Sequence, residues 1–288
     1  DDIKTKDELK KLPIINKEIV RTHWKDFISK KFYWWQTFEV STSGSTGAAL
    51  KILYEKASIL RERCFQLRLR EWAGIDMTAK LAHLGSMDFL FLETNTKKQF
   101  WKISYPEKTI YFSPYHLSED NLPVYHKKLK QFEPECIRGH PSKIYIIAKY
   151  MEREGFNDIT PSAIFTSSEM LLPHQRKTIE NVFGSKVFDF YGNNEHVSAI
   201  TQCEREKYHM NSEYGIIEFI KNGEEIAPNE TGEMVCTGFI NYAMPFIRYN
   251  IEDLAIPSHE PCDCNRNLPV VHSIQGRTRD IIITQDGR

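Results

Sequence analysis

Residues 162–196 read SAIFTSSEMLLPHQRKTIENVFGSKVFDFYGNNEH, and the order of elements in this stretch decides the fold class. The apolar runs at 162–167 and 186–190 are typical of buried strands. Between them, residues 174–183 form a helical pattern that ends before Gly184, a residue suited to the end of a helix. A strand, a helix and a second strand in this order predict neighbouring parallel strands covered by helices.

The same alternation precedes this stretch, and a different pattern follows it. We expect helices over 57–73, 122–132 and 143–154, the last capped by Ser142 and ended by Gly155, and strands at 80–86, 109–114 and 135–139. After residue 190, short strands at 215–220, 232–238, 245–250 and 253–256 are joined by turns such as KNGE at 221–224. The sequence therefore predicts an α/β fold. A mainly parallel sheet layered with helices occupies 1–190, and a smaller antiparallel β-rich part occupies 191–288.

Composition narrows the class of protein. Lys plus Arg number 38 and Asp plus Glu 39, so the formal net charge of -1 offers no basic excess for nucleic acid. The sequence contains no run of 18 apolar residues, so a membrane-spanning helix is not expected. Six cysteines are too few for a secreted disulfide scaffold, which favours a reduced, cytoplasmic protein. The oligomeric state stays open, a homo-oligomer included.

The stretch STSGSTGAAL at residues 41–50 is rich in hydroxyl groups and glycine. Backbone N–H groups in such a loop can hold an anion, although a solvated turn is the commoner use of this composition. Apolar runs at 36–40 and 50–54 flank the loop and predict that it joins two strands. A P-loop is disfavoured because Gly47 is followed by Ala48 rather than by Lys and Ser or Thr.

Four motifs then occur in an order that resembles a known family. These are STSGSTG at 41–47, YGNNE at 191–195, RYNIEDLA at 248–255 and GRTRD at 276–280. Together they resemble the nucleotide-binding motifs of the adenylate-forming (acyl-CoA synthetase) superfamily. LPIINKEIV at 12–20 and GHPSKI at 139–144 are most similar to its phenylacetate–CoA ligase-like branch, which includes relatives associated with capsular polysaccharide synthesis.

The resemblance implies the large N-terminal domain of an enzyme that joins a carboxylate to the α-phosphate of ATP, after which a thiol, usually coenzyme A, displaces AMP. Residues 1–190 would bind nucleotide and acyl group, and residues 191–288 would complete the ATP site. Glu195 matches the acid that holds Mg²⁺, Asp253 the acceptor of the ribose hydroxyls, and Arg277 a cation for ribose or phosphate. The resemblance assigns catalysis to Thr46, Glu195 and Arg277. It assigns nucleotide binding to Ser43, Gly44, Ser45, Thr46, Gly47, Ser168, Glu169, Tyr191 (stacked on adenine), Gly192 and Asn194.

Three positions depart from the family pattern. Asn194 stands where Ser or Thr is common, and Arg279 stands where the family has an acidic hinge residue. The lysine-bearing C-terminal domain of the family lies outside the sequence, which starts at Asp1 and stops at Arg288 after an apolar run. We therefore expect a chain trimmed at both ends that binds nucleotide but adenylates weakly.

A second constellation contains three cysteines and one histidine: Cys203, His209, Cys262 and Cys264. This donor set suits structural Zn²⁺, and a Cys/His cluster in this region also occurs in some members of the resembled branch. The alternative is four unrelated residues in loops, because about 53 residues separate the two halves. Cys64, Cys136 and Cys236 lie in apolar runs and are predicted to be core thiols.

His83 and His140 follow predicted strands and are candidates for contact with the acyl substrate, although a structural role is the commoner use of such residues. Trp34 and Trp35 are predicted to lie in the core or on a packing surface. The favoured function is ATP-dependent activation of a small-molecule carboxylate, followed by transfer to coenzyme A. Two alternatives remain, namely transfer of the acyl group to an amine or sugar in polysaccharide assembly, and a non-catalytic remnant that binds nucleotide or a protein.

Overall fold

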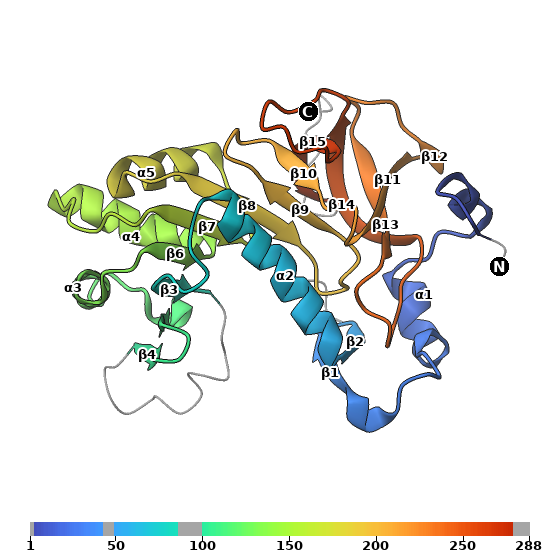
Figure 1. The fold of residues 1–288 in the computed structure, drawn as a ribbon, viewed down its shortest axis with the longest axis horizontal. Helices are drawn as coiled ribbons and strands as arrows, with labels where there is room; N and C mark the ends of the chain where they lie inside the picture. The colour runs from blue at the N-terminus through green and yellow to red at the C-terminus, as the bar shows by residue number, and fades with distance from the viewer. Residues whose placement is uncertain (1–2, 43–48, 86–99, 279–288) are drawn as a thin grey trace, which may run out of the picture. The chain divides into compact units, whose positions relative to one another are not determined.

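The computed structural model describes residues 3–42, 49–85 and 100–278 (Figure 1), and the chain divides into two compact units. The first unit contains Asp1–Gln66, Gly192–Thr201 and Arg205–Arg288, and the second contains Leu67–Tyr191 and Gln202–Glu204. Helix α2 (Lys56–Trp72) contributes residues to both units. The division of the chain at residues 190 and 191 that the sequence suggests stays a prediction.

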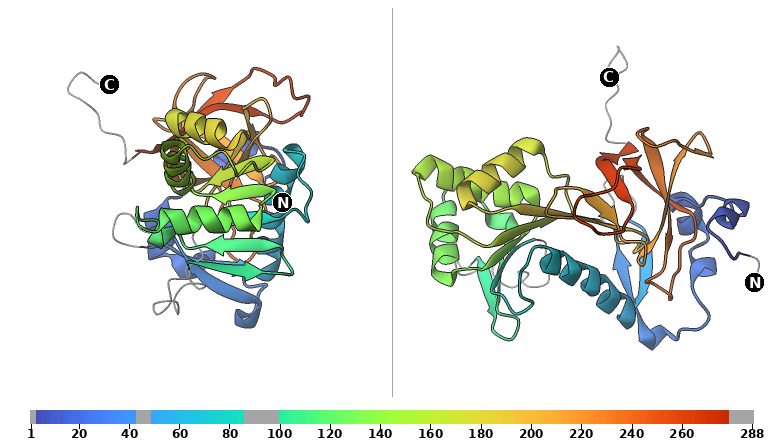
Figure 2. Two further views of the ribbon diagram at one scale, coloured as in Figure 1. Left: turned by 90° about the vertical axis from the view of Figure 1, so that its left-hand side faces the viewer. Right: turned by 45° about the horizontal axis from the view of Figure 1, so that its top comes forward.

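The second unit is built on parallel strands, as the alternation of strands and helices predicts. In spatial order these are β8 (Val187–Gly192), β7 (Ala163–Ser167), β6 (Cys136–Gly139), β3 (Leu81–Leu84) and β5 (Thr109–Phe112), and β4 (Trp101–Ser104) pairs antiparallel with β5. Helices α3 (Leu122–Phe132), α4 (Pro141–Glu154) and α5 (Pro173–Phe183) connect or flank these strands (Figure 2). A short 3-10 helix at Pro114–His116 precedes α3.

The two faces of these parallel strands differ in chemistry because successive side chains point to opposite faces. Ala82, Ile110, Ile137 and Ile164 are register partners and are buried with residues of α3, α4 and α5 in one apolar cluster. One position further along the strands, the register instead aligns Tyr111, His83, Arg138 and Phe165. The helices therefore pack on a face that is mainly apolar. Thr166 and Asp189 are polar residues on this face, and they are buried and hydrogen-bonded to each other.

The first unit is β-rich and mainly antiparallel. Strands β12 (Glu224–Glu225), β11 (Gly215–Lys221), β13 (Gly232–Gly238), β14 (Tyr249–Ser258), β15 (Val270–Arg277) and β10 (Tyr208–Met210) follow one another in space, and β9 (Ala199–Gln202) comes next to β10. The predicted strands at 215–220 and 232–238 are confirmed. The predicted strands at 245–250 and 253–256 are wrong as separate elements. Residues 245–248 form no strand, and β14 begins at Tyr249 and continues through 253–256 with bulges in its pairing.

Two further parts complete the first unit. Strands β1 (Thr37–Ser41) and β2 (Lys51–Glu55) form a separate antiparallel pair. Helix α1 (Lys17–Thr22) lies among three short 3-10 segments, Asp7–Lys11, Trp24–Phe27 and Trp34–Gln36. Asn16 is the N-cap of helix α1, and its side chain accepts a hydrogen bond from the Ile19 N–H at 2.9 Å.

Helix ends test the predictions from local sequence. Gly155 and Gly184 end α4 and α5 with φ of 73° and 65°, as expected for glycine at a helix C-terminus. Ser142 is not the cap of α4, because the helix begins one residue earlier at Pro141. The Ser142 N–H instead donates to the Glu169 carboxylate at 3.2 Å.

Burial corrects the expectation for Cys64 and the core alternative for Trp34 and Trp35. Cys136 and Cys236 are buried as predicted, but Cys64 is exposed. The buried apolar positions of α2 are Phe65 and Leu69, four residues apart, and Cys64 is turned about 100° away from Phe65. Trp34 and Trp35 are 82% and 59% exposed, so they do not belong to the core of the described chain.

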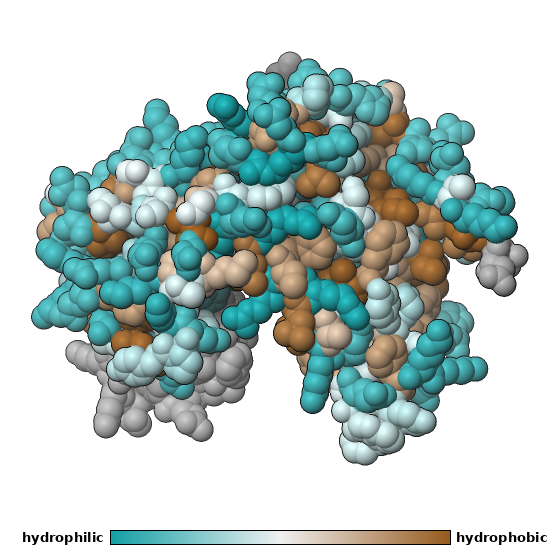
Figure 3. Space-filling model, in the orientation of Figure 1, coloured by the Kyte–Doolittle hydropathy of each residue, from teal (hydrophilic) through white to brown (hydrophobic). Residues whose placement is uncertain are grey.

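Hydrophilic residues cover most of the face drawn in Figure 3. Within the described residues, every helix is too short or too polar to cross a membrane.

Candidate functional site

The hydroxyl-rich loop joins two adjacent strands, as its flanking sequences predict. Ser41 at the end of β1 pairs with Lys51 at the start of β2. The Thr42 N–H donates to the Leu50 carbonyl at 2.9 Å, and the Leu50 N–H donates to Thr42 Oγ1 at 3.0 Å, which closes the base of the loop. The predicted phosphate-binding residues lie outside the described residues: Ser43, Gly44, Ser45, Thr46 and Gly47.

Glu195 and Asn194 lie in the turn between β8, which ends at Gly192, and β9. The Tyr249 hydroxyl, at the start of β14, donates to Glu195 Oε1 at 3.3 Å. Burial raises the pKa of the Glu195 carboxyl, and the negative charge of Asp253 acts in the same direction, whereas Lys17 and the bond from Tyr249 lower it. An acid at this position would therefore gain from a cation that offsets its desolvation.

Asp253 on β14 and Arg277 on β15 lie opposite each other in the antiparallel register. Arg277 Nε is 3.8 Å from Asp253 Oδ1, and the Arg277 side chain is 50% exposed against 16% for Asp253. The distance between the two charged groups is long and the Arg277 side chain is exposed to solvent, so this ion pair contributes little to the stability of the fold. The first unit thus brings Glu195, Asp253 and Arg277 together, although they are up to 82 residues apart in sequence.

The remaining predicted nucleotide residues belong to the second unit. Ser168 directly follows β7, and Tyr191 is the second-last residue of β8. The two residues occupy neighbouring positions because Ser167 pairs with Phe190. Ser168 has φ of 71°, a left-handed conformation that turns the chain sharply after the strand. Glu169 then reaches the start of α4, where its carboxylate accepts from the Ser142 N–H and lies 3.5 Å from His140 Nδ1.

The two candidate substrate histidines lie at the ends of adjacent strands. His83 is on β3, and His140 directly follows β6. Burial lowers the pKa of His83 to about 3, and the positive charges of Arg138, His140 and Arg70 act in the same direction. His83 is therefore neutral at physiological pH, so one of its ring nitrogens can donate a hydrogen bond and the other can accept one.

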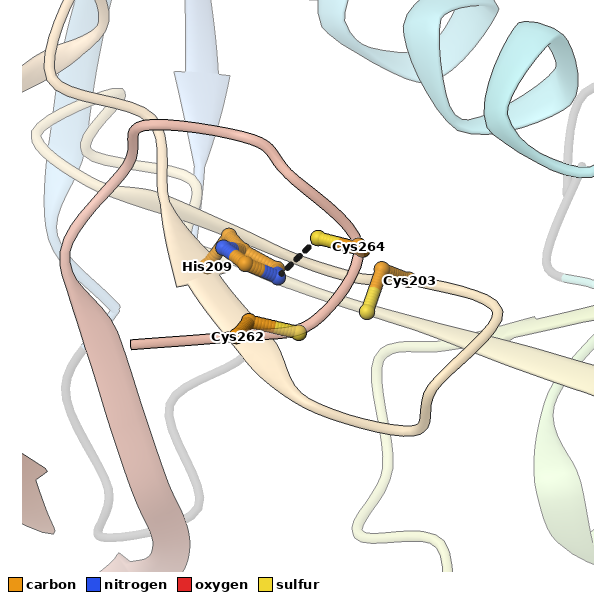
Figure 4. A group of neighbouring side chains, drawn as sticks. All are labelled: Cys203, His209, Cys262 and Cys264. Atoms are coloured by element: carbon orange, nitrogen blue, oxygen red, sulfur yellow. Dashed lines mark hydrogen bonds between the residues drawn. The ribbon is translucent and has the colours of Figure 1, made fainter. Parts of the chain in front are cut away.

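The structure brings the four metal-ligand candidates together (Figure 4). Cys203 follows β9 and His209 is on β10, while Cys262 and Cys264 lie in the connection from β14 to β15. The candidate ligand atoms all lie within 4.8 Å of one another, and His209 Nε2 is 3.4 Å from Cys264 Sγ. Cys203 and His209 are buried, and the other two are partly buried.

Sequence reasoning missed two tyrosines and one buried arginine. Tyr249 lies inside the quoted motif RYNIEDLA, and a contact to Glu195, the predicted metal ligand, could have been suspected from that position. Tyr54, whose hydroxyl donates to the Asn194 carbonyl, stands in a plain strand pattern with no signal. Arg248 belongs to the same motif as Tyr249, yet it forms a buried ion pair with Glu218 and contacts none of the candidate nucleotide residues through a bond that the structure describes.

Comparison with known proteins relates this geometry to two curated sequences, although no family model matches the chain. Protein CapK of Staphylococcus aureus is 27% identical over 280 residues, which cover 96% of this chain and 61% of CapK. Phenylacetate-coenzyme A ligase of Thermus thermophilus is 26% identical over 163 residues, covering 54% of this chain and 37% of the ligase. The chain thus spans about three-fifths of the length of CapK.

Solved structures share the fold. A 2-hydroxyisobutyryl-CoA ligase in complex with 2-HIB-AMP and CoA superposes with a TM-score of 0.76 at 17% identity, covering 99% of this chain and 68% of the ligase. The anthranilate CoA ligase AuaEII in complex with anthranoyl-AMP has a TM-score of 0.58 at 11% identity, with 86% and 48% covered. The expected α/β fold is thereby confirmed.

Proposed function

Because the chain belongs to the adenylate-forming acyl-CoA ligase superfamily, in the branch of CapK and phenylacetate-coenzyme A ligase, we propose that it takes part in ATP-dependent activation of a carboxylate. The carboxylate oxygen attacks the α-phosphorus of ATP, the bond to pyrophosphate breaks, and an acyl-adenylate forms. The thiol of coenzyme A then attacks the acyl carbon and releases AMP.

One observation carries this proposal, namely the convergence of Glu195, Asp253 and Arg277 in the first unit. A carboxylate is a weak nucleophile, and the phosphorus it attacks is surrounded by negative oxygens, so catalysis requires positioning and charge neutralisation. Asp253 would accept hydrogen bonds from the ribose hydroxyls. Arg277, half exposed and a permanent cation, would reach ribose or phosphate.

The donor chemistry at Glu195 fits Mg²⁺. Mg²⁺ prefers oxygen ligands and is commonly bound by one or two carboxylates together with substrate phosphates. The Glu195 carboxyl is held by Tyr249, and its pKa is raised by burial, so a nearby divalent cation would stabilise its charged form. When bound, the ion would neutralise phosphate charge.

The other predicted roles complete the proposal. Thr46 and the rest of the loop at 43–47 would hold the β- and γ-phosphates. Tyr191 would stack on adenine beside the main chain of Ser168 and Glu169. His83 and His140 would contact the acyl part of the substrate. The small number of cysteines for a chain of this length favours a reducing, cytoplasmic setting.

The test is isothermal titration of ATP into the chain at several Mg²⁺ concentrations. Asp253→Asn keeps the shape of the side chain, and we expect it to weaken binding by about 5- to 100-fold because charge-assisted bonds to the ribose are lost. Glu195→Gln should abolish the gain in affinity that Mg²⁺ provides. Glu230→Gln, at an exposed position of the same unit, should leave binding unchanged.

Absence of ATP binding in the folded wild-type chain would contradict the proposed function. Binding that survives both site substitutions would contradict the assignment of the residues. If ATP binding is observed, exchange of labelled pyrophosphate into ATP, measured across a panel of carboxylic acids, would identify the substrate.

We further propose structural Zn²⁺ at Cys203, His209, Cys262 and Cys264. Bonds of about 2.3 Å to sulfur and 2.0 Å to nitrogen place neighbouring ligand atoms of a tetrahedral zinc site about 3.5–3.8 Å apart. The ligand atoms here span at most 4.8 Å, and the Nε2 to Sγ distance is 3.4 Å, which fits this geometry. The ion would tie the connection from β14 to β15 to the start of β10.

Metal analysis of the purified chain tests the zinc proposal. We expect about one zinc per chain, lost in Cys264→Ser. Cys64→Ser removes an exposed thiol outside the cluster and should retain the metal. Equal zinc content in the two variants would show that the cluster does not bind it.

A further inference from the structure

The turn that carries Glu195 is contacted from β2 by a single tyrosine. Tyr54 is 6% exposed, and its hydroxyl donates to the backbone carbonyl of Asn194. Its ring stacks on the imidazole of His196, with centroids 4.2 Å apart and planes 17° from parallel. The two contacts bracket Glu195, because they fall on the residue before it and the residue after it.

The rest of the turn is held by other elements of the first unit. The side-chain amide nitrogen of Asn193 donates to Ser198 Oγ at 2.7 Å, and Oδ1 of the same side chain accepts from the Val197 N–H at 3.1 Å. A Cβ built on Gly238 of β13 would lie 2.6 Å from the His196 carbonyl oxygen, so only glycine allows this approach. The residues after Glu195 are therefore supported by β13 and by the ring of Tyr54, and the Tyr54 hydroxyl supports the residue before it.

The conformation of the turn needs such support. His196 has φ of 54°, a left-handed backbone conformation that is uncommon for residues other than glycine. Such a conformation persists only where the surroundings hold it, and it typically costs about 1–3 kcal/mol. The stack of Tyr54 lies at His196, the residue with this conformation, and the bond from its hydroxyl holds Asn194 two residues earlier.

We propose that Tyr54 is a positioning residue that fixes the Glu195 carboxylate for Mg²⁺ bound with ATP. This inference rests on the proposed function. A metal ligand must be held to within about 0.5 Å of its working position, and the contacts of Tyr54 with the residues on either side of Glu195 restrain it in this way.

Tyr54→Phe tests the inference because it removes one oxygen and keeps the stacked ring. Losing this hydrogen bond should raise the Mg²⁺ concentration for half-maximal enhancement of ATP binding by about 2- to 10-fold. ATP binding without Mg²⁺ should not change, because the substitution keeps the ring and removes only the hydroxyl, which bonds to the turn. A merely structural role would weaken both measurements equally.

Tyr214→Phe is the matched control. Tyr214 is also buried in the first unit, but its hydroxyl donates to the Glu62 carboxylate of α2 rather than to the turn. We expect wild-type Mg²⁺ dependence in this variant. An equal shift in both variants, or none in Tyr54→Phe, would overturn the inference.

Hydrogen exchange of the peptide covering 192–198 gives a second readout that needs no ligand. Exchange should be faster in Tyr54→Phe and unchanged in Tyr214→Phe, and equal exchange in the two would likewise overturn the inference. Failure of the wild-type chain to bind Mg²⁺ with ATP would instead refute the proposed function, so the two failures are distinguishable.

Discussion

Removal of Arg248 should cost the first unit a large part of its stability. Arg248 and Glu218 are 7% and 3% exposed, and the guanidinium forms two parallel bonds, Nε to Oε2 and Nη2 to Oε1, both at 3.1 Å. Nη1 also donates to the Leu12 carbonyl at 2.6 Å, which holds the N-terminal segment against β14. Arg248→Met removes these bonds and leaves a buried carboxylate without its partner.

The magnitude follows from the geometry. Two bonds to a charged group are worth about 3–6 kcal/mol together, and breaking a buried ion pair from one side costs about 3–5 kcal/mol. We therefore expect the free energy of unfolding of the first unit to fall by about 3–5 kcal/mol. Removing both charges in Arg248→Met with Glu218→Met should bring the loss to about 2 kcal/mol or less, because the stranded charge is gone.

The assay is urea unfolding followed by hydrogen exchange of peptides covering β11 and β14, so that the free energy belongs to the first unit. The control is Lys51→Met, which removes an exposed ion pair with Glu39 in the same unit and should lower this free energy far less. The reasoning is refuted if Arg248→Met costs no more than Lys51→Met, or if the double variant is no more stable than the single one.

Two further predictions concern protons and metal. The pKa of His83 is lowered to about 3 by burial and the nearby cations, so between pH 3 and 6.5 the unfolded chain binds a proton there that the folded chain does not. The contribution of His83 to the free energy of unfolding is therefore fully present above pH 6.5 and is lost on acidification, by about 2 kcal/mol at pH 5. Unfolding measured at pH 7.5 and 5.0 should show this loss in the wild type but not in His83→Gln. Chelation of zinc should speed hydrogen exchange in the 203–209 and 259–269 segments, and unchanged exchange would mean that no ion holds them together.

The sequence determined the features that depend on neighbouring residues. Apolar periodicity and glycine at helix ends are local properties, so the strands and helices of the second unit and the ends of α4 and α5 at Gly155 and Gly184 were predictable. The antiparallel strands flanking the hydroxyl loop were predictable for the same reason. The order of the four motifs pointed to the superfamily before any side chain was placed.

Only the tertiary structure decided which distant residues meet. The pairing of Asp253 with Arg277 depends on the register between β14 and β15, and the Cys/His cluster depends on where the connection between those strands folds back. Tyr54 at Asn194 and the exposure of Cys64 are set by which face of an element is buried. Local periodicity does not specify these contacts, because burial and register minimise free energy over the whole packed unit rather than over neighbours in the chain.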